Sequence, residues 1–160
     1  MHGSKIAQAG LLMATLAFPS HTTLAAISPF AAMAGTWSGG GVLQSSDGTR
    51  ERLRCRAGYD VAGGDELRLN LRCASASYNF DLTSQVQYRG GAISGSWSEA
   101  SRNASGTISG RANGGQIEAS AMGQNFSAEL SLSTRGNRQF VSLRPRGTNI
   151  AEVSLELNRR

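Results

Sequence analysis

The chain has 160 residues, with 16 lysines and arginines against 11 acidic residues and a formal net charge of +5. Its only histidines are His2 and His21, and its only lysine is Lys5. The rest of the chain therefore offers no imidazole for a catalytic triad or a metal site, and no lysine for a Schiff base or a phosphate clamp. This composition predicts one non-catalytic domain with no cofactor and no bound metal.

The N-terminal segment reads as a secretory signal peptide. Lys5 supplies the positive region, and the mostly apolar stretch from Ile6 to Phe18 is too short to span a bilayer. Thr23 and Ala25 fit the small positions of a cleavage before Ala26. We therefore predict a signal peptide over residues 1–25, a single domain over residues 26–160 with no transmembrane segment, and a periplasmic or secreted bacterial protein. The alternative for the apolar stretch of the N-terminal segment is a short buried or interfacial helix.

Two alternating runs follow and predict a disulfide-bonded hairpin. In residues 50–59 the arginines share one face, and Leu53, Cys55 and Tyr59 share the other. Residues 66–73 place three leucines and Cys73 on one face. A turn centred on Gly64 sets Cys55 opposite Cys73, at a separation that a disulfide can bridge. In the same register Arg56 lies opposite Arg72 on the outer face. Two buried free thiols are the alternative.

The same alternation of apolar and polar residues continues to the C-terminus, interrupted at short intervals by glycine-rich turns. The candidate strands are residues 35–44, 49–59, 66–74, 77–88, 92–99, 106–112, 116–122, 126–133, 139–144 and 150–158. Because so many hairpin-linked strands leave two exposed edges unless the sheet closes, we predict an all-β fold, an up-and-down antiparallel β-barrel of about 8–10 strands. A β-sandwich is the alternative.

A Gly-small-large-Ser pattern recurs at strand starts, including those that hold Trp37 and Trp97. Glycine lets a strand bend or a neighbouring backbone approach, and the large residue two places later points inward. The two tryptophans are therefore either walls that stack on a ligand or plugs of the core. If the barrel holds a ligand, the candidate residues that line its pocket are Trp37, Trp97, Tyr59, Phe80 and Phe126.

Two of these motifs resemble the calycin superfamily of lipocalin- and avidin-type barrels. Gly35-Thr36-Trp37, after the turn-forming segment 28–33, is similar to the Gly-x-Trp that opens their first strand, and Gly95-Ser96-Trp97 is similar to a second strand-opening motif in avidin-like barrels. The resemblance implies a barrel with a pocket. It also implies that Trp37 closes one end under an arginine from a late strand, for which Arg144, Arg159 and Arg160 are the candidates.

The second conspicuous feature is a stripe of arginines on the outer face of the predicted hairpin. Its members are Arg50, Arg52, Arg54, Arg56, Arg68 and Arg72. Arginine binds phosphate and carboxylate through a planar fork, so the stripe is a candidate anion-binding surface. The alternative is a solvated outer face that reflects codon usage. Nucleic acid is not an expected partner, because the protein is exported and the stripe lacks interleaved aromatic residues.

The leading functional hypothesis is an exported, non-catalytic protein that captures a small apolar or amphipathic ligand inside the barrel. The alternative is a cell-envelope interaction module whose arginine-rich face contacts protein or anionic envelope material. Small inward residues, such as Ala119 and Ala121, leave open whether the barrel is hollow or filled.

Overall fold

The computed structural model describes residues 27–160, so the predicted signal peptide lies outside the described part. Two 3-10 helices, η1 (Pro29–Ala32) and η2 (Ala100–Arg102), accompany ten strands. The strands are β1 (Gly35–Ser45), β2 (Arg50–Ala62), β3 (Glu66–Ala74), β4 (Asn79–Arg89), β5 (Ala92–Glu99), β6 (Ala104–Asn113), β7 (Gln116–Gly123), β8 (Phe126–Arg135), β9 (Arg138–Arg146) and β10 (Ile150–Arg159). Every strand expected from the alternating pattern is present.

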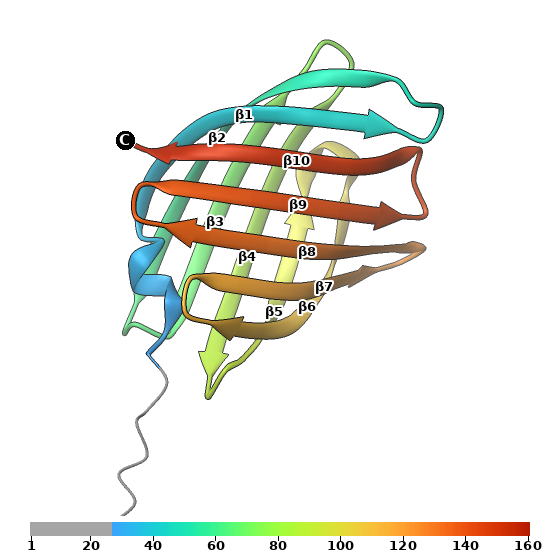
Figure 1. The fold of residues 1–160 in the computed structure, drawn as a ribbon. Coiled ribbons are helices and arrows are strands. Elements are labelled where there is room, and N and C mark those ends of the chain that lie inside the picture. Colours follow the sequence, from blue (N-terminus) through green and yellow to red (C-terminus); the bar gives the residue numbers. More distant parts are fainter. Residues whose placement is uncertain (1–26) are drawn as a thin grey trace, which may run out of the picture.

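Each strand pairs antiparallel with its neighbour in the chain, and β1 pairs with β10 to close the barrel. The prediction of an up-and-down antiparallel barrel is therefore confirmed, and the fold is not the alternative β-sandwich. Figure 1 shows β7 to β10 forming one wall that crosses β2 to β5 of the opposite wall at a steep angle. Within residues 27–160 no helix has the length and apolar character needed to cross a membrane.

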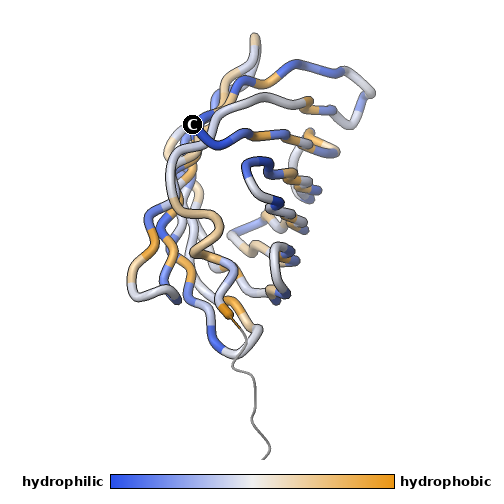
Figure 2. Tube along the Cα trace, turned by 60° about the vertical axis from the view of Figure 1, so that its left-hand side comes forward, coloured by the Kyte–Doolittle hydropathy of each residue, from blue (hydrophilic) through white to orange (hydrophobic). Residues whose placement is uncertain are grey.

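Hydrophobic and hydrophilic residues alternate along the strands, as the colours in Figure 2 illustrate. On β2, Leu53, Ala57 and Tyr59 are buried inside, while Arg54 and Arg56 between them are exposed outside. This period of two is what one buried and one solvated face require. The buried apolar side chains supply the hydrophobic driving force for closure.

Glycines on the inner face let strands approach closely. A Cβ added to Gly95, Gly106 or Gly110 would collide with backbone atoms of the adjacent strand. The expectation that the recurring glycines permit backbone approach is thus confirmed at these positions.

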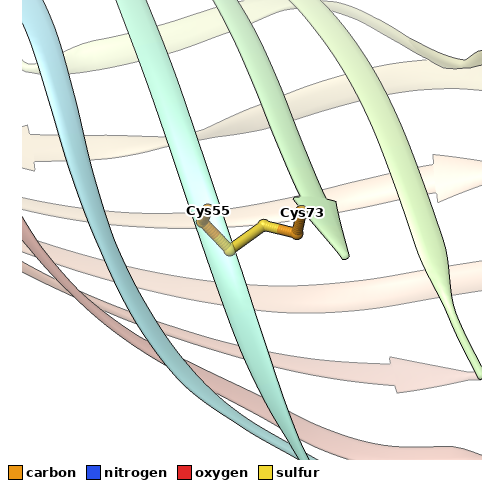
Figure 3. The surroundings of a disulfide bond; sticks show 2 residues. All are labelled: Cys55 and Cys73. Atoms are coloured by element: carbon orange, nitrogen blue, oxygen red, sulfur yellow. A yellow bond between two sulfur atoms is a disulfide. The ribbon is translucent and has the colours of Figure 1, made fainter. Parts of the chain in front are cut away.

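Cys55 and Cys73 face each other in the β2–β3 register and form a disulfide (Figure 3). The predicted pairing is therefore confirmed, and the alternative of two free thiols is wrong. Both residues are buried, so the bond ties two neighbouring strands together from inside the barrel.

Candidate functional site

One end of the barrel is closed by η1 and the residues that follow it, and we call it the plugged end (lower left in Figure 1). Phe30 and Met33 are buried there, and the indole Nε1 of Trp37 donates a hydrogen bond of 2.8 Å to the carbonyl of Met33. The Arg159 guanidinium lies 4.4 Å from the centroid of the Trp37 ring and bonds to carbonyls of the η1 segment. Of the three arginines that the calycin resemblance suggested, Arg159 is the one that covers this tryptophan.

A buried polar network spans the plugged end beneath Trp37. The Tyr59 hydroxyl donates to Gln139 Oε1 at 2.6 Å, and Gln139 Nε2 donates to Thr134 Oγ1 at 3.1 Å. Burial raises the pKa of Tyr59. In residues 27–160 no buried side-chain nitrogen or oxygen lacks a partner, so the buried polar groups at this end are all paired within the protein.

Between the two ends the inner wall carries apolar side chains that are only half-buried. Leu130 on β8 is an example. Its neighbours Glu129 and Ser131 bond to Ser120 and Glu118 on the outer face, so Leu130 points inward and still retains exposed area. The same holds across a belt of the wall, which comprises Leu69, Leu71, Leu82, Ile108, Ala121, Leu130, Val141 and Leu143. These inward-facing apolar side chains therefore retain some accessible surface.

The opposite end, which we call the mouth, carries a second aromatic group. Trp97 lies at the end of β5 opposite Gly106, which pairs in turn with Gly123. An added Cβ at Gly123 would meet the Trp97 ring, so the absence of a side chain at Gly123 makes room for the indole. Phe126 packs edge-on against Trp97 at 5.3 Å between centroids. Trp97 is buried but lies outside the contiguous cluster formed by most of the buried apolar residues.

The rim of the mouth is held by contacts between loops. Tyr78 stacks on Phe80 at 6.2 Å, the Arg102 guanidinium lies 4.7 Å from the Phe80 centroid, and the Tyr78 hydroxyl accepts a hydrogen bond from Asn149. These contacts join the β3–β4, β5–β6 and β9–β10 connections. The rim is therefore aromatic and partly polar, in contrast to the apolar belt below it.

Glu99 anchors the η2 turn at this rim. Its carboxylate accepts hydrogen bonds from the backbone amides of Asp81, Ser101 and Arg102 and lies 3.4 Å from the Arg102 guanidinium. Burial acts to raise the pKa of Glu99, but the amide bonds and the Arg102 charge outweigh it and hold the pKa below its usual value. The carboxylate therefore serves as a structural anchor in the ionised form.

The five predicted lining residues occupy two separate places. Trp37 and Tyr59 touch edge-on at the plugged end, where both are buried. Trp97 and Phe126 form a pair at the mouth, and Phe80 is part of the rim. The sequence reading did not single out Gln139, Glu99 or Arg102. Gln139 alone had a clear signal, since it is the one polar residue on a strand face shared with Val141 and Leu143.

All six arginines of the predicted stripe are exposed on the outer wall. Arg56 lies opposite Arg72 in the β2–β3 register as expected, and Arg72 contacts Asp81 at 3.3 Å. Arg68 contacts Glu66 at 3.6 Å. The other members have no carboxylate within 4.0 Å in the described part of the chain; they are Arg50, Arg52, Arg54 and Arg56. The outer face of β2 therefore carries positive charge that nearby carboxylates largely leave unneutralised.

No protein-family model matches this chain, and no curated protein matches it in sequence. Among solved structures, the barrel is similar to the crystal structure of Rv2717c from M. tuberculosis, with a TM-score of 0.68. The two are 15% identical, and the match covers 84% of this chain and 97% of the other. Similarity at that identity shows a shared fold.

Proposed function

We propose that this protein is an exported, non-catalytic binding protein that holds a small apolar or amphipathic ligand in the barrel interior. The observation that carries the proposal is the belt of half-buried, inward-facing apolar side chains between the plugged end and the mouth. Apolar side chains that retain contact with water inside a closed wall gain free energy when an apolar molecule displaces that water.

The chemistry of the wall supports an apolar ligand body. Its polar groups are occupied by the protein itself, since Ser84 Oγ donates to the Ser96 carbonyl and Trp97 Nε1 donates to the Thr107 carbonyl. A ligand in the belt therefore finds mainly alkyl and aromatic surface, and a polar group on it is best accommodated near Arg102 at the rim. The Trp37–Arg159 stack agrees with the calycin resemblance, and the disulfide is consistent with an oxidising, periplasmic or secreted location.

A neutral fluorescent apolar probe, N-phenyl-1-naphthylamine, tests the proposal without engaging the arginines. We expect it to bind the barrel, to change Trp97 emission and to raise the melting temperature, because it binds only the folded state. The variant Ala121→Phe fills the belt, so it should weaken probe binding by at least about tenfold while the barrel remains as stable as before. Ala151, exposed on β10, provides the matched control Ala151→Phe, which should leave binding unchanged.

Two results would contradict the proposal. The first is the absence of probe binding to the unaltered protein. The second is a loss of about 1–3 kcal/mol of stability in Ala121→Phe, which is the cost of overpacking an already filled core. Either result would leave the exposed outer wall as the binding surface.

A further inference from the structure

A concave groove lies on the outside of the barrel, beside the arginine stripe. This outer groove has a volume of about 930 Å³, and its floor is the β1 backbone at Gly40, Gly41 and Val42. Arg52 and Arg54 of β2, together with the adjacent residues Ala74, Ser75 and Ala76, form one wall. The opposite wall is formed by residues of β9 and β10, namely Phe140, Ser154 and Glu156.

The middle of the floor is low because Gly40 presents no side chain there. Gly40 faces outward, and a Cβ added to it would meet the carbonyl oxygen of Leu53. The backbone is thus open to a flat group lying against it. Gly40 pairs with Arg54 on one side and with Glu156 on the other, so opposite charges flank the floor. Two strand spacings separate them, roughly 10 Å.

The two walls of the groove differ in charge and would contact different groups of one ligand. Arg52 and Arg54 have no carboxylate within 4.0 Å in residues 27–160, so they can grip a carboxylate of the ligand through charge-assisted hydrogen bonds. Glu156, which contacts Arg138 at 3.9 Å, repels an anion but accepts hydrogen bonds from hydroxyl groups. Phe140 beside it is 43% exposed and offers a flat apolar face. The matching ligand has an acid group on one edge, hydroxyl groups on the other edge and an apolar ring face. A sugar acid has these three features.

We propose that the outer groove binds a chain of acidic sugar rings, an anionic polysaccharide with carboxylates along its length. A single ring is much smaller than the groove, whose volume is near the upper end for small-molecule sites. The arginines also continue beyond it, because Arg50 and Arg56 extend the row with a repeat of about 6.8 Å, the two-residue repeat of a strand. A periodic row of cations matches a polymer with regularly repeated anions.

Other polyanions fit less well. An extended acidic peptide would normally add to a free strand edge, but β1 is paired on both sides and the closed barrel leaves it no edge. A flat anionic membrane would reach the tips of the arginines and not the glycine floor between the walls. Both remain as distinct outcomes of the test.

Calorimetric titration with a hexamer of galacturonic acid tests the proposal on the purified barrel. We expect binding that weakens at least about tenfold in Arg52→Gln/Arg54→Gln, since each charge-assisted bond is worth about one decade or more. The fully methyl-esterified hexamer should bind the unaltered protein comparably weakly. Phe140→Ala should weaken both the acid and its ester, because it removes the contact to the ring and not to the charge. The galacturonic acid monomer should bind far more weakly than the hexamer.

The matched control removes the same charge elsewhere. Arg89 and Arg111 are exposed on β4 and β6 outside the groove, and Arg89→Gln/Arg111→Gln should change hexamer affinity by less than about twofold. An equal loss in this control would reduce the effect to net charge and overturn the proposal. So would the absence of hexamer binding, an unchanged affinity in Phe140→Ala, or equal binding of the monomer. Polyglutamate or phosphatidylglycerol vesicles that bind as tightly as the hexamer, with the same sensitivity to Arg52 and Arg54, would also overturn it.

Discussion

The buried Tyr59–Gln139–Thr134 network makes a quantitative prediction about the plugged end. Gln139 is fully buried and makes one hydrogen bond with each of the two hydroxyls. The substitution Gln139→Leu keeps a similar volume but leaves both hydroxyls without a partner. Each orphaned buried group costs about 1–3 kcal/mol, so the variant should lose about 2–6 kcal/mol of stability.

A double-mutant cycle separates this cause from a packing defect. Tyr59→Phe alone leaves Gln139 Oε1 unpaired and should cost about 1–3 kcal/mol. In the combined variant only the Thr134 hydroxyl is orphaned, so its loss should lie close to that of Tyr59→Phe and well below the sum of the two single losses.

Urea unfolding followed by tryptophan fluorescence measures the free energy of unfolding of all three variants. An equal slope m in all of them confirms that the denatured state is unchanged. Trp37 contacts Tyr59 and reports directly on this region. Additive losses in the cycle, or a Gln139→Leu variant as stable as the parent, would refute the reasoning that the network is held by mutual satisfaction of buried groups.

Two further predictions concern the mouth and the hairpin. Because the folded-state pKa of Glu99 is depressed, its ionised form stabilises the barrel above the ordinary glutamate pKa, and this contribution is lost as the pH falls through the folded value. The variant Glu99→Gln should therefore show a weaker loss of stability on acidification, measured by thermal melts between pH 7 and pH 3. Cys55→Ala/Cys73→Ala should lose about 3 kcal/mol, the chain-entropy value for a loop of this length, since the residues are 18 apart. Unfolding of this double variant by urea measures the loss, and two alkylated thiols in the non-reduced parent protein would contradict it.

The strands and their neighbours were accessible from sequence because both depend on local signals. Alternation of apolar and polar residues sets which face of a strand is buried, and the glycine turn near Gly64 sets the hairpin register. Together they predicted that Cys55 faces Cys73 and that Arg56 faces Arg72, and the structure confirms both. Each of these pairs lies within one hairpin, where the short turn permits few alternative strand registers.

Contacts across the barrel were not accessible in the same way. Tyr59 and Gln139 are 80 residues apart, and their contact depends on how the strands tilt when the sheet closes. The aromatic candidates show the same limit, since sequence grouped five residues that the fold divides between the plugged end and the mouth. The outer groove was equally hidden, because Phe140 and Arg54 face each other only once β10 closes onto β1.

The interior space follows from strand number and side-chain size more than from any motif. Barrel diameter grows with the number of strands, so ten strands need more filling than eight. The inner faces of β6 and β7 supply little of it, since glycine and alanine prevail there, as at Gly106, Gly110, Ala119 and Ala121. Trp97 fills part of the interior at the mouth, and the inward-facing side chains of the belt stay half-buried. If this belt lines the ligand site proposed above, a bound apolar ligand adds packing contacts there and stabilises the folded barrel.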